Sequence, residues 1–185
     1  MQITIEQLED IADLANDRNR AIYFPHINEA IKKYSINNPL RVSAFLSQIL
    51  HESCYFKYVE EIASGSAYEY RKDLGNLEPI ALKIAHEHGS TTGKYFKGSG
   101  LLQITGYFNY LAVSKALEID CVNNPSLLRQ PKYATLSAGW FFDTHNCNSL
   151  ADIDNNKAIT KIINGGFNGL EERMAIYNKA KSILL

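Results

Sequence analysis

The sequence predicts a mainly α-helical fold in a single domain. Apolar residues recur every three or four positions along several segments, which is the spacing of helices with one buried face. No long segment alternates polar and apolar residues, so the strand signal is weak. The chain has 185 residues, 45% of them hydrophobic, and no repeat or linker divides it. Residues 1–185 are therefore expected to form one domain, with room for two lobes around a cleft.

Three helices are expected in the N-terminal part. Thr4 and Gln7 have the spacing of a capping box, and apolar residues at helical spacing follow them. Pro25 is expected to open the second helix, because proline is favoured in a first turn. An Asn-Pro pair at 38–39 is expected to start the third helix, which runs to Glu52.

The rest of the chain is expected to form loops and then further helices. Residues 54–79 are rich in turn formers and have room for at most a small β-hairpin, between 55 and 75. Four glycines between 93 and 106 predict turns around a short extended piece. Further helices are expected over residues 80–88, 107–118, 132–145, 157–163 and 170–184.

Glu52 is the first candidate for chemistry. It follows apolar residues at 42, 45, 46, 49 and 50, and it lies on or beside the buried face that they mark. A carboxylate that loses hydration favours its protonated form, and a carboxyl group protonated near neutral pH can act as a general acid. The alternative is a helix that simply ends here, with Glu52 in water.

The glycine-rich segment 94–110 is the second candidate. Gln103 and Thr105 alternate with apolar residues, so both could lie on one side of an extended piece and bind a sugar hydroxyl or a water molecule. The alternative is a turn with surface polar groups. Asn164 precedes a Gly-Gly pair and is either a helix C-cap or a ligand contact.

Composition narrows the function classes. The net charge of −1 gives no support to nucleic-acid binding, whereas eleven tyrosines suit a sugar-binding protein. Cys54, Cys121 and Cys147 cannot all pair, so free thiols in a reducing cytoplasm are expected. No metal is expected, because His86 and His88 stand two positions apart on a predicted helix and do not converge. The first residues resemble no signal peptide, and no segment is long enough to insert into a membrane.

Three motifs, in this order, resemble the signature of glycoside hydrolase family 19, which contains chitinases and many phage endolysins. They are the segment 45–53, the segment 96–106 with Asn109-Tyr110, and the segment 162–166 with Arg173. The resemblance covers residues 23–184 and is strongest to compact phage endolysins. It implies a lysozyme-like helical fold with two lobes and a central cleft, no cofactor, and inverting hydrolysis of a β-1,4-linked N-acetylhexosamine polymer.

The resemblance also implies roles for individual residues. Glu52 matches the general acid, Glu61 the general base, and Thr105 the residue that helps to hold the attacking water. The residues expected to contact substrate are Gln103, Asn109, Asn164 and Arg173, together with Tyr68 and Glu69.

The spacing of Glu52 and Glu61 constrains the chain between them. In one continuous helix nine residues would span about 13.5 Å, whereas the carboxyl groups of inverting glycosidases lie about 6.5–9.5 Å apart. The helix must therefore end soon after Glu52. Glu60 competes as the base, but neighbours in an extended segment face opposite ways, and Glu61 is favoured.

Glu69 is a third candidate for the base, or else a structural partner of Arg71 or Arg173. Some positions depart from the family pattern. Cys54-Tyr55 stand where relatives have Gly-Gly after the acid, Ser99 replaces the arginine of Gly-Arg-Gly, and Tyr70 replaces a glycine. These departures affect substrate preference but leave the expected acid, base and hydroxyl in place.

The expected function is hydrolysis of peptidoglycan glycan strands by an endolysin-type enzyme, acting as a monomer. The small size and the missing signal peptide favour it over a secreted chitinase. The protein would be made in the cytoplasm and would reach the cell wall after release. The alternatives are a chitinase of the same fold, acting on a chitin-like polysaccharide, and a catalytically weak wall-binding protein.

Overall fold

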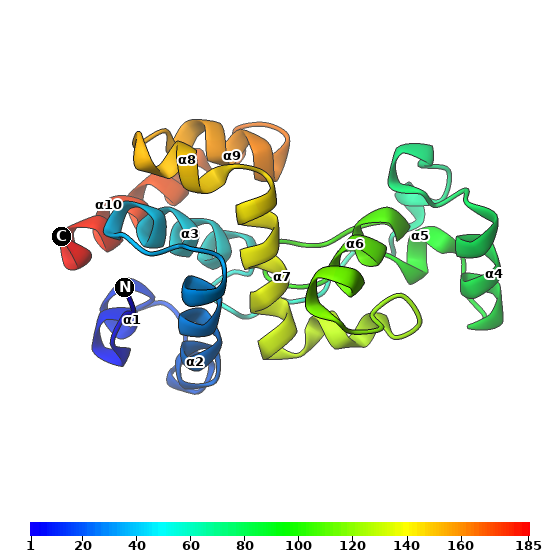
Figure 1. Cartoon of the computed structure of the whole chain (residues 1–185), viewed down its shortest axis with the longest axis horizontal. Coiled ribbons are helices and arrows are strands. Elements are labelled where there is room, and N and C mark those ends of the chain that lie inside the picture. The colour runs from blue at the N-terminus through cyan, green and yellow to red at the C-terminus, as the bar shows by residue number, and fades with distance from the viewer.

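The computed structural model describes residues 1–185 and confirms a mainly α fold without a sheet. Two lobes flank a central helix (Figure 1). The larger lobe is built from both ends of the chain, from helices α1 (Ile5–Ile11), α2 (Asp17–Lys33), α3 (Pro39–Glu52), α8 (Cys147–Asp152), α9 (Asn156–Asn164) and α10 (Leu170–Leu184).

The smaller lobe comes from the middle of the chain. It contains η1 (Ser66–Tyr68), η2 (Lys72–Leu74), α4 (Pro79–Glu87), α5 (Thr92–Tyr95) and α6 (Tyr107–Leu117). The short helix η3 (Pro125–Arg129) then leads into the central helix α7 (Pro131–Thr144). Helix α7 packs on α2 of the larger lobe and on α6 of the smaller lobe, so it joins the two.

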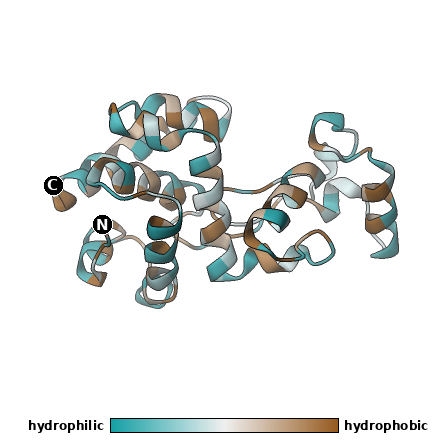
Figure 2. Cartoon of the chain, in the orientation of Figure 1, coloured by the Kyte–Doolittle hydropathy of each residue, from teal (hydrophilic) through white to brown (hydrophobic).

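Helix α3 is the core helix of the larger lobe. Every residue from 42 to 50 is buried, because α3 packs against α10, α8, α9 and α7. Phe45 of α3 meets Phe142 of α7 edge to face, with ring centroids 5.5 Å apart. Hydrophobic residues, brown in Figure 2, recur along the packed helices. No helix of the chain has the length and apolar character needed to cross a membrane.

Local signals fix several helix ends as expected. Thr4 and Gln7 form the predicted capping box of α1, and the Asn38 side chain caps α3 by accepting from the Arg41 amide at 2.9 Å. The five helices predicted after residue 80 agree with α4, α6, α7, α9 and α10 within one residue at each end.

Pro25 does not open the second helix, so that prediction is wrong. Helix α2 begins at Asp17, capped by the Asn16 side chain, and runs through Pro25. A proline inside a helix removes one backbone hydrogen bond. The helix persists because Tyr23 and Ile27, on either side of the proline, are buried in the core.

The stretch expected to form loops and turns also differs. No hairpin forms between residues 55 and 75, which agrees with the prediction of at most a small one; Glu60 makes an isolated β-bridge to Ser99, and Ser99 makes another to Ile104. The short helix α5 overlaps the start of the segment 93–106 that was expected to be turns, and α8 lies between two predicted helices. The six residues of α8 follow Asn146, whose left-handed backbone gives no ordinary N-cap signal.

Candidate active site

Glu52 is the last residue of α3, and its side chain is 20% exposed. The sequence predicted a carboxyl group on or beside an apolar face and indicated no polar partner for it. Instead, Arg173 of α10 donates to Glu52 Oε1. The Arg173 side chain is 1% exposed and also donates to Gln48 Oε1 at 2.5 Å. Arg173 was expected to contact substrate. In the structure it is a buried hydrogen-bond partner of the candidate acid.

The first turn of α10 holds Arg173 in this position. Gly169, with φ of 69°, caps the helix, and a Cβ atom there would clash with the His51 ring. His51 Nδ1 lies 2.8 Å from Glu172 Oε2. The neighbouring residues His51 and Glu52 of α3 therefore contact the neighbouring residues Glu172 and Arg173 of α10. These two contacts fix how the helices are aligned.

A left-handed turn follows Glu52 and bends the chain back. Cys54, Tyr55 and Phe56 have φ of 48°, 56° and 66°. Ser53 Oγ accepts from the Phe56 amide at 2.8 Å, and the buried Phe56 ring stacks on Tyr23 with centroids 4.8 Å apart. The helix break that the Glu52–Glu61 spacing required is therefore present.

Glu61 lies in a short extended segment beside Gly98. The Glu61 amide donates to the Gly98 carbonyl at 2.9 Å, and the Gly98 amide donates to Glu61 Oε2 at 3.2 Å. Tyr68 Oη donates to Glu61 Oε1 at 3.1 Å. Two neutral donors hold this carboxylate, and no cation pairs with it.

Glu60 is in a different environment. Its Oε1 lies 2.9 Å from Lys97 Nζ and 3.0 Å from Arg129 Nη2, so two cations share it. Both ion pairs engage the Glu60 carboxylate, whereas no cation pairs with Glu61. Of the two neighbours, Glu61 has the environment that suits a base.

Three side-chain oxygens gather around Gly98. A Cβ atom at Gly98 would lie 2.6 Å from Gln103 Oε1, 3.2 Å from Glu61 Oε2 and 3.3 Å from Thr105 Oγ1. Gln103 and Thr105 meet here as expected, but the segment is a tight turn, with Gln103 at φ of 51°, rather than an extended piece. The missing side chain of Gly98 leaves space among three polar atoms.

Glu52 and Glu61 line one depression of about 340 Å³, to which Gln103 contributes its amide. The other lining residues are Tyr58, Glu60, Ile62 and Ala63. Glu52 and Glu61 therefore line the same depression although they come from different parts of the chain.

Glu69 does not join this depression. Its carboxylate accepts from the Thr91 hydroxyl and, at 3.2 Å, from the Gly93 amide. The expected pairing with Arg71 or Arg173 is wrong, because Arg71 binds Asp73 and Arg173 binds Glu52.

Asn109 and Asn164, both expected to contact substrate, do not line the depression. Asn109 Nδ2 donates to the Thr105 carbonyl at 2.8 Å and so holds the turn that carries Thr105. Asn164 is the exposed last residue of α9, and Gly165 follows with φ of 74°, which fits the helix-end alternative.

The sequence alone assigned no role to Gln48. Gln48 is a fully buried amide in an apolar helix, one turn before Glu52, and that placement was a signal for a polar partner. Gly98 belongs to the glycine-rich segment in which a close approach to a ligand is expected, and three side-chain oxygens surround it.

Comparisons with known proteins agree on one family. Residues 23–152 match the model of the glycoside hydrolase family 19, described as chitinase class I. A glycosyl hydrolase family 19 domain-containing protein of Haemophilus influenzae is 28% identical over 182 residues, covering 83% of this chain and 89% of that protein. An endochitinase of Arabidopsis thaliana is 33% identical over 127 residues, covering 68% of this chain but only 39% of the plant protein.

Solved structures of low sequence identity share the fold. Chitinase C from Streptomyces griseus superposes with a TM-score of 0.72 at 18% identity, covering 98% of this chain and 76% of that chain. A class IV chitinase of the same family from Zea mays has a TM-score of 0.74 at 18% identity, covering 98% and 92%.

Proposed function

Because the chain belongs to glycoside hydrolase family 19, we propose that it cleaves the glycan strands of peptidoglycan with inversion at the anomeric carbon. Membership of the family makes it a glycosidase of chitin-like or peptidoglycan-like polysaccharides. The observation that carries the proposal is the shared depression in which Glu52 and Glu61 meet from separate segments.

In the proposed reaction the two carboxyl groups move one proton each. Protonated Glu52 donates its proton to the glycosidic oxygen as the bond to the anomeric carbon breaks. Glu61 removes a proton from a water molecule, and the water oxygen bonds the anomeric carbon from the opposite face. The products are a free hydroxyl group and an inverted reducing end, and exchange with solvent restores both carboxyl groups.

Neighbouring groups suit these roles. The Arg173 guanidinium would stabilise the carboxylate that Glu52 becomes after it gives up its proton. Tyr68 and the Gly98 amide orient Glu61, and the space at Gly98 lets Thr105 and Gln103 help to hold the attacking water.

One observation supports peptidoglycan as the substrate and the cell wall as the place of action. All three cysteines are free, with Cys54 exposed, which suits folding in a reducing cytoplasm before release to the wall as a monomer.

Mass spectrometry of the products tests this proposal. The protein is incubated with purified peptidoglycan and, separately, with colloidal chitin, and Glu52→Gln is the control. We expect soluble muropeptides from peptidoglycan, with a new reducing sugar that identifies the cleaved bond, and none with Glu52→Gln. Products from chitin alone would favour the chitinase alternative, and binding without any product would favour a wall-binding protein.

A further inference from the structure

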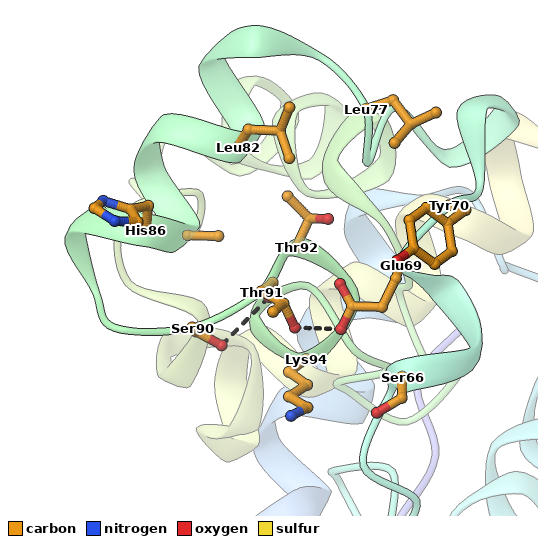
Figure 3. A pocket seen from close by; sticks show the side chains of 11 residues that line it. Ser66, Glu69, Tyr70, Leu77, Leu82, His86, Ser90, Thr91, Thr92 and Lys94 are labelled. Carbon is orange, nitrogen blue, oxygen red and sulfur yellow. Dashed lines mark hydrogen bonds between the residues drawn. The ribbon is translucent and has the colours of Figure 1, made fainter.

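A second cavity, of about 540 Å³, lies in the smaller lobe and shares no lining residue with the Glu52–Glu61 depression. Figure 3 shows the side chains that line it. We propose that it is a non-catalytic binding site for an N-acetylated amino sugar of a peptidoglycan strand, together with the carboxylate of the peptide that the sugar carries. This inference rests on the proposed function, because it names the polymer that the same enzyme would hold.

The floor of this cavity is apolar. Leu77 and Leu82 stand together on one side of it in Figure 3, and they are 42% and 48% exposed. Tyr70, beside Glu69, is 87% exposed and has no packing partner among the aromatic residues. Exposed apolar side chains gathered at one cavity indicate a binding site. A tyrosine face suits the C–H face of a sugar ring, and the leucines suit the methyl of an acetamido group.

Hydroxyl groups and one free cation form the rim. Ser66, Ser90 and Thr91 line the cavity and offer hydrogen-bonding groups for sugar hydroxyls. Lys94 is exposed and makes no ion pair. A neutral polysaccharide such as chitin gives this ammonium no partner, whereas a peptide carboxylate does.

An adjoining cavity of about 660 Å³ extends the positive charge. It shares Ser90 and Lys94 with the first cavity and adds Lys97 and Arg129, which both pair with Glu60. The two cavities together hold three cations and two carboxylates, Glu60 and Glu69, although the whole chain has a net charge of −1. This local excess attracts an anionic polymer.

The walls of the site are held rigidly. The backbones of η1 and α5 touch at Gly65 and Gly93, where a Cβ atom on Gly93 would lie 2.6 Å from the Gly65 carbonyl oxygen. Glu69 ties the two segments together through Thr91 and Gly93. A preformed site loses little conformational entropy when it binds.

A short segment links this site to the candidate active site. Tyr68 donates to Glu61, while the next two residues, Glu69 and Tyr70, line the second cavity. A polymer that reaches both places is held at two points, which raises its effective concentration at the carboxylate pair.

Sedimentation with insoluble polymer tests the site. Binding to purified peptidoglycan and to colloidal chitin is measured in the Glu52→Gln background, with Tyr70→Ala and Lys94→Glu as test variants. Leu14→Ala is the matched control, because Leu14 is 73% exposed and lies in the larger lobe. We expect peptidoglycan affinity to fall about tenfold for each test variant and to stay unchanged for the control. Circular dichroism confirms that all variants are folded.

The outcomes separate this inference from the proposed function. Folded Tyr70→Ala and Lys94→Glu variants that bind peptidoglycan as well as the control does would overturn the site. Equal affinities for chitin and peptidoglycan, both unchanged in Lys94→Glu, would overturn the inference that the ligand is anionic. If binding depends on Tyr70 and Lys94 but the native chain releases no muropeptides, the site stands and only the proposed function fails.

Discussion

The buried guanidinium of Arg173 bonds the carboxylate of Glu52 across 121 positions of the sequence. The same side chain donates to Gln48 one turn earlier on α3. The C-terminal helix therefore completes the surroundings of a carboxyl group supplied by the core helix, so the stability of the larger lobe and the geometry of the site depend on one contact.

Replacing Arg173 by Met should destabilise the fold by about 3–5 kcal/mol, because it leaves Glu52 and Gln48 without their donor. Lys should recover only part of this loss, because an ammonium cannot bond both partners as the planar guanidinium does. Urea unfolding measures the difference. Exposed Arg18 is the control, and a loss no larger than that of Arg18→Met would show that the pair contributes nothing.

Cys54→Gly should stabilise the protein by about 0.5–1 kcal/mol. Cys54 is exposed and has φ of 48°, a left-handed conformation that costs an L-residue about 1–2 kcal/mol, part of which the greater entropy of unfolded glycine offsets. Lys57→Gly, at the next exposed residue outside the left-handed turn, should destabilise instead. Thermal unfolding of the two variants compares them, and an equal loss in both would refute the strain.

Gly98→Ala should reduce turnover about 100-fold with little change in stability, since a methyl group would displace the oxygens of Gln103, Glu61 and Thr105. Gly89→Ala is the opposite case. Gly89 has φ of 65° and open space around it, so alanine there should cost about 1 kcal/mol and leave turnover intact. Steady-state kinetics and urea unfolding of both variants check the contrast, and full activity in Gly98→Ala would contradict it.

Protonation of the Asp152 carboxylate should lower the free energy of unfolding at acid pH. Hydrogen bonds from Arg41 and Asn38 lower the pKa of Asp152 from 3.8 to about 2. A lowered folded-state pKa gives stability that is present above the unfolded pKa and is lost as pH falls through the folded pKa. Because Asp152 is more than a third exposed, we expect Asp152→Asn to lose about 1 kcal/mol at pH 7. Unfolding free energies should show this gap close between pH 4 and pH 2, and a gap independent of pH would contradict the pairing.

Much of the helical fold could be predicted, because the helices predicted after residue 80 are nine to fifteen residues long, which is long enough for apolar residues to recur at helical spacing. The prediction for Pro25 was wrong, because sequence shows only the local free-energy cost of a proline inside a helix. The burial of Tyr23 and Ile27, which outweighs this cost, depends on tertiary packing. Helix α8 carries no capping side chain and is only six residues long, so its sequence gives little periodic signal.

The site was predictable where neighbours in sequence decide it. The family resemblance implies Glu61 as the partner of Glu52; given that pair, their spacing requires the break after Glu52, and alternation along an extended segment predicts different environments for Glu60 and Glu61. The role of Arg173 was not predictable, because it depends on how α10 packs against α3. Glu69 likewise accepts a hydrogen bond from Thr91 at the start of α5. The two residues are more than twenty positions apart, so no local pattern predicts this contact.

The rate at which Glu61→Gln releases reducing ends from the glycan, beside Glu60→Gln and Glu69→Gln, tests the Glu52–Glu61 pair most directly. Loss of a positioned general base should lower the rate of Glu61→Gln by about 10²–10⁴-fold. Glu60→Gln and Glu69→Gln should retain more than about a tenth of the activity, since those carboxylates hold neighbouring groups rather than the attacking water. Full activity in Glu61→Gln, with the loss found at Glu60 or Glu69 instead, would contradict the assignment.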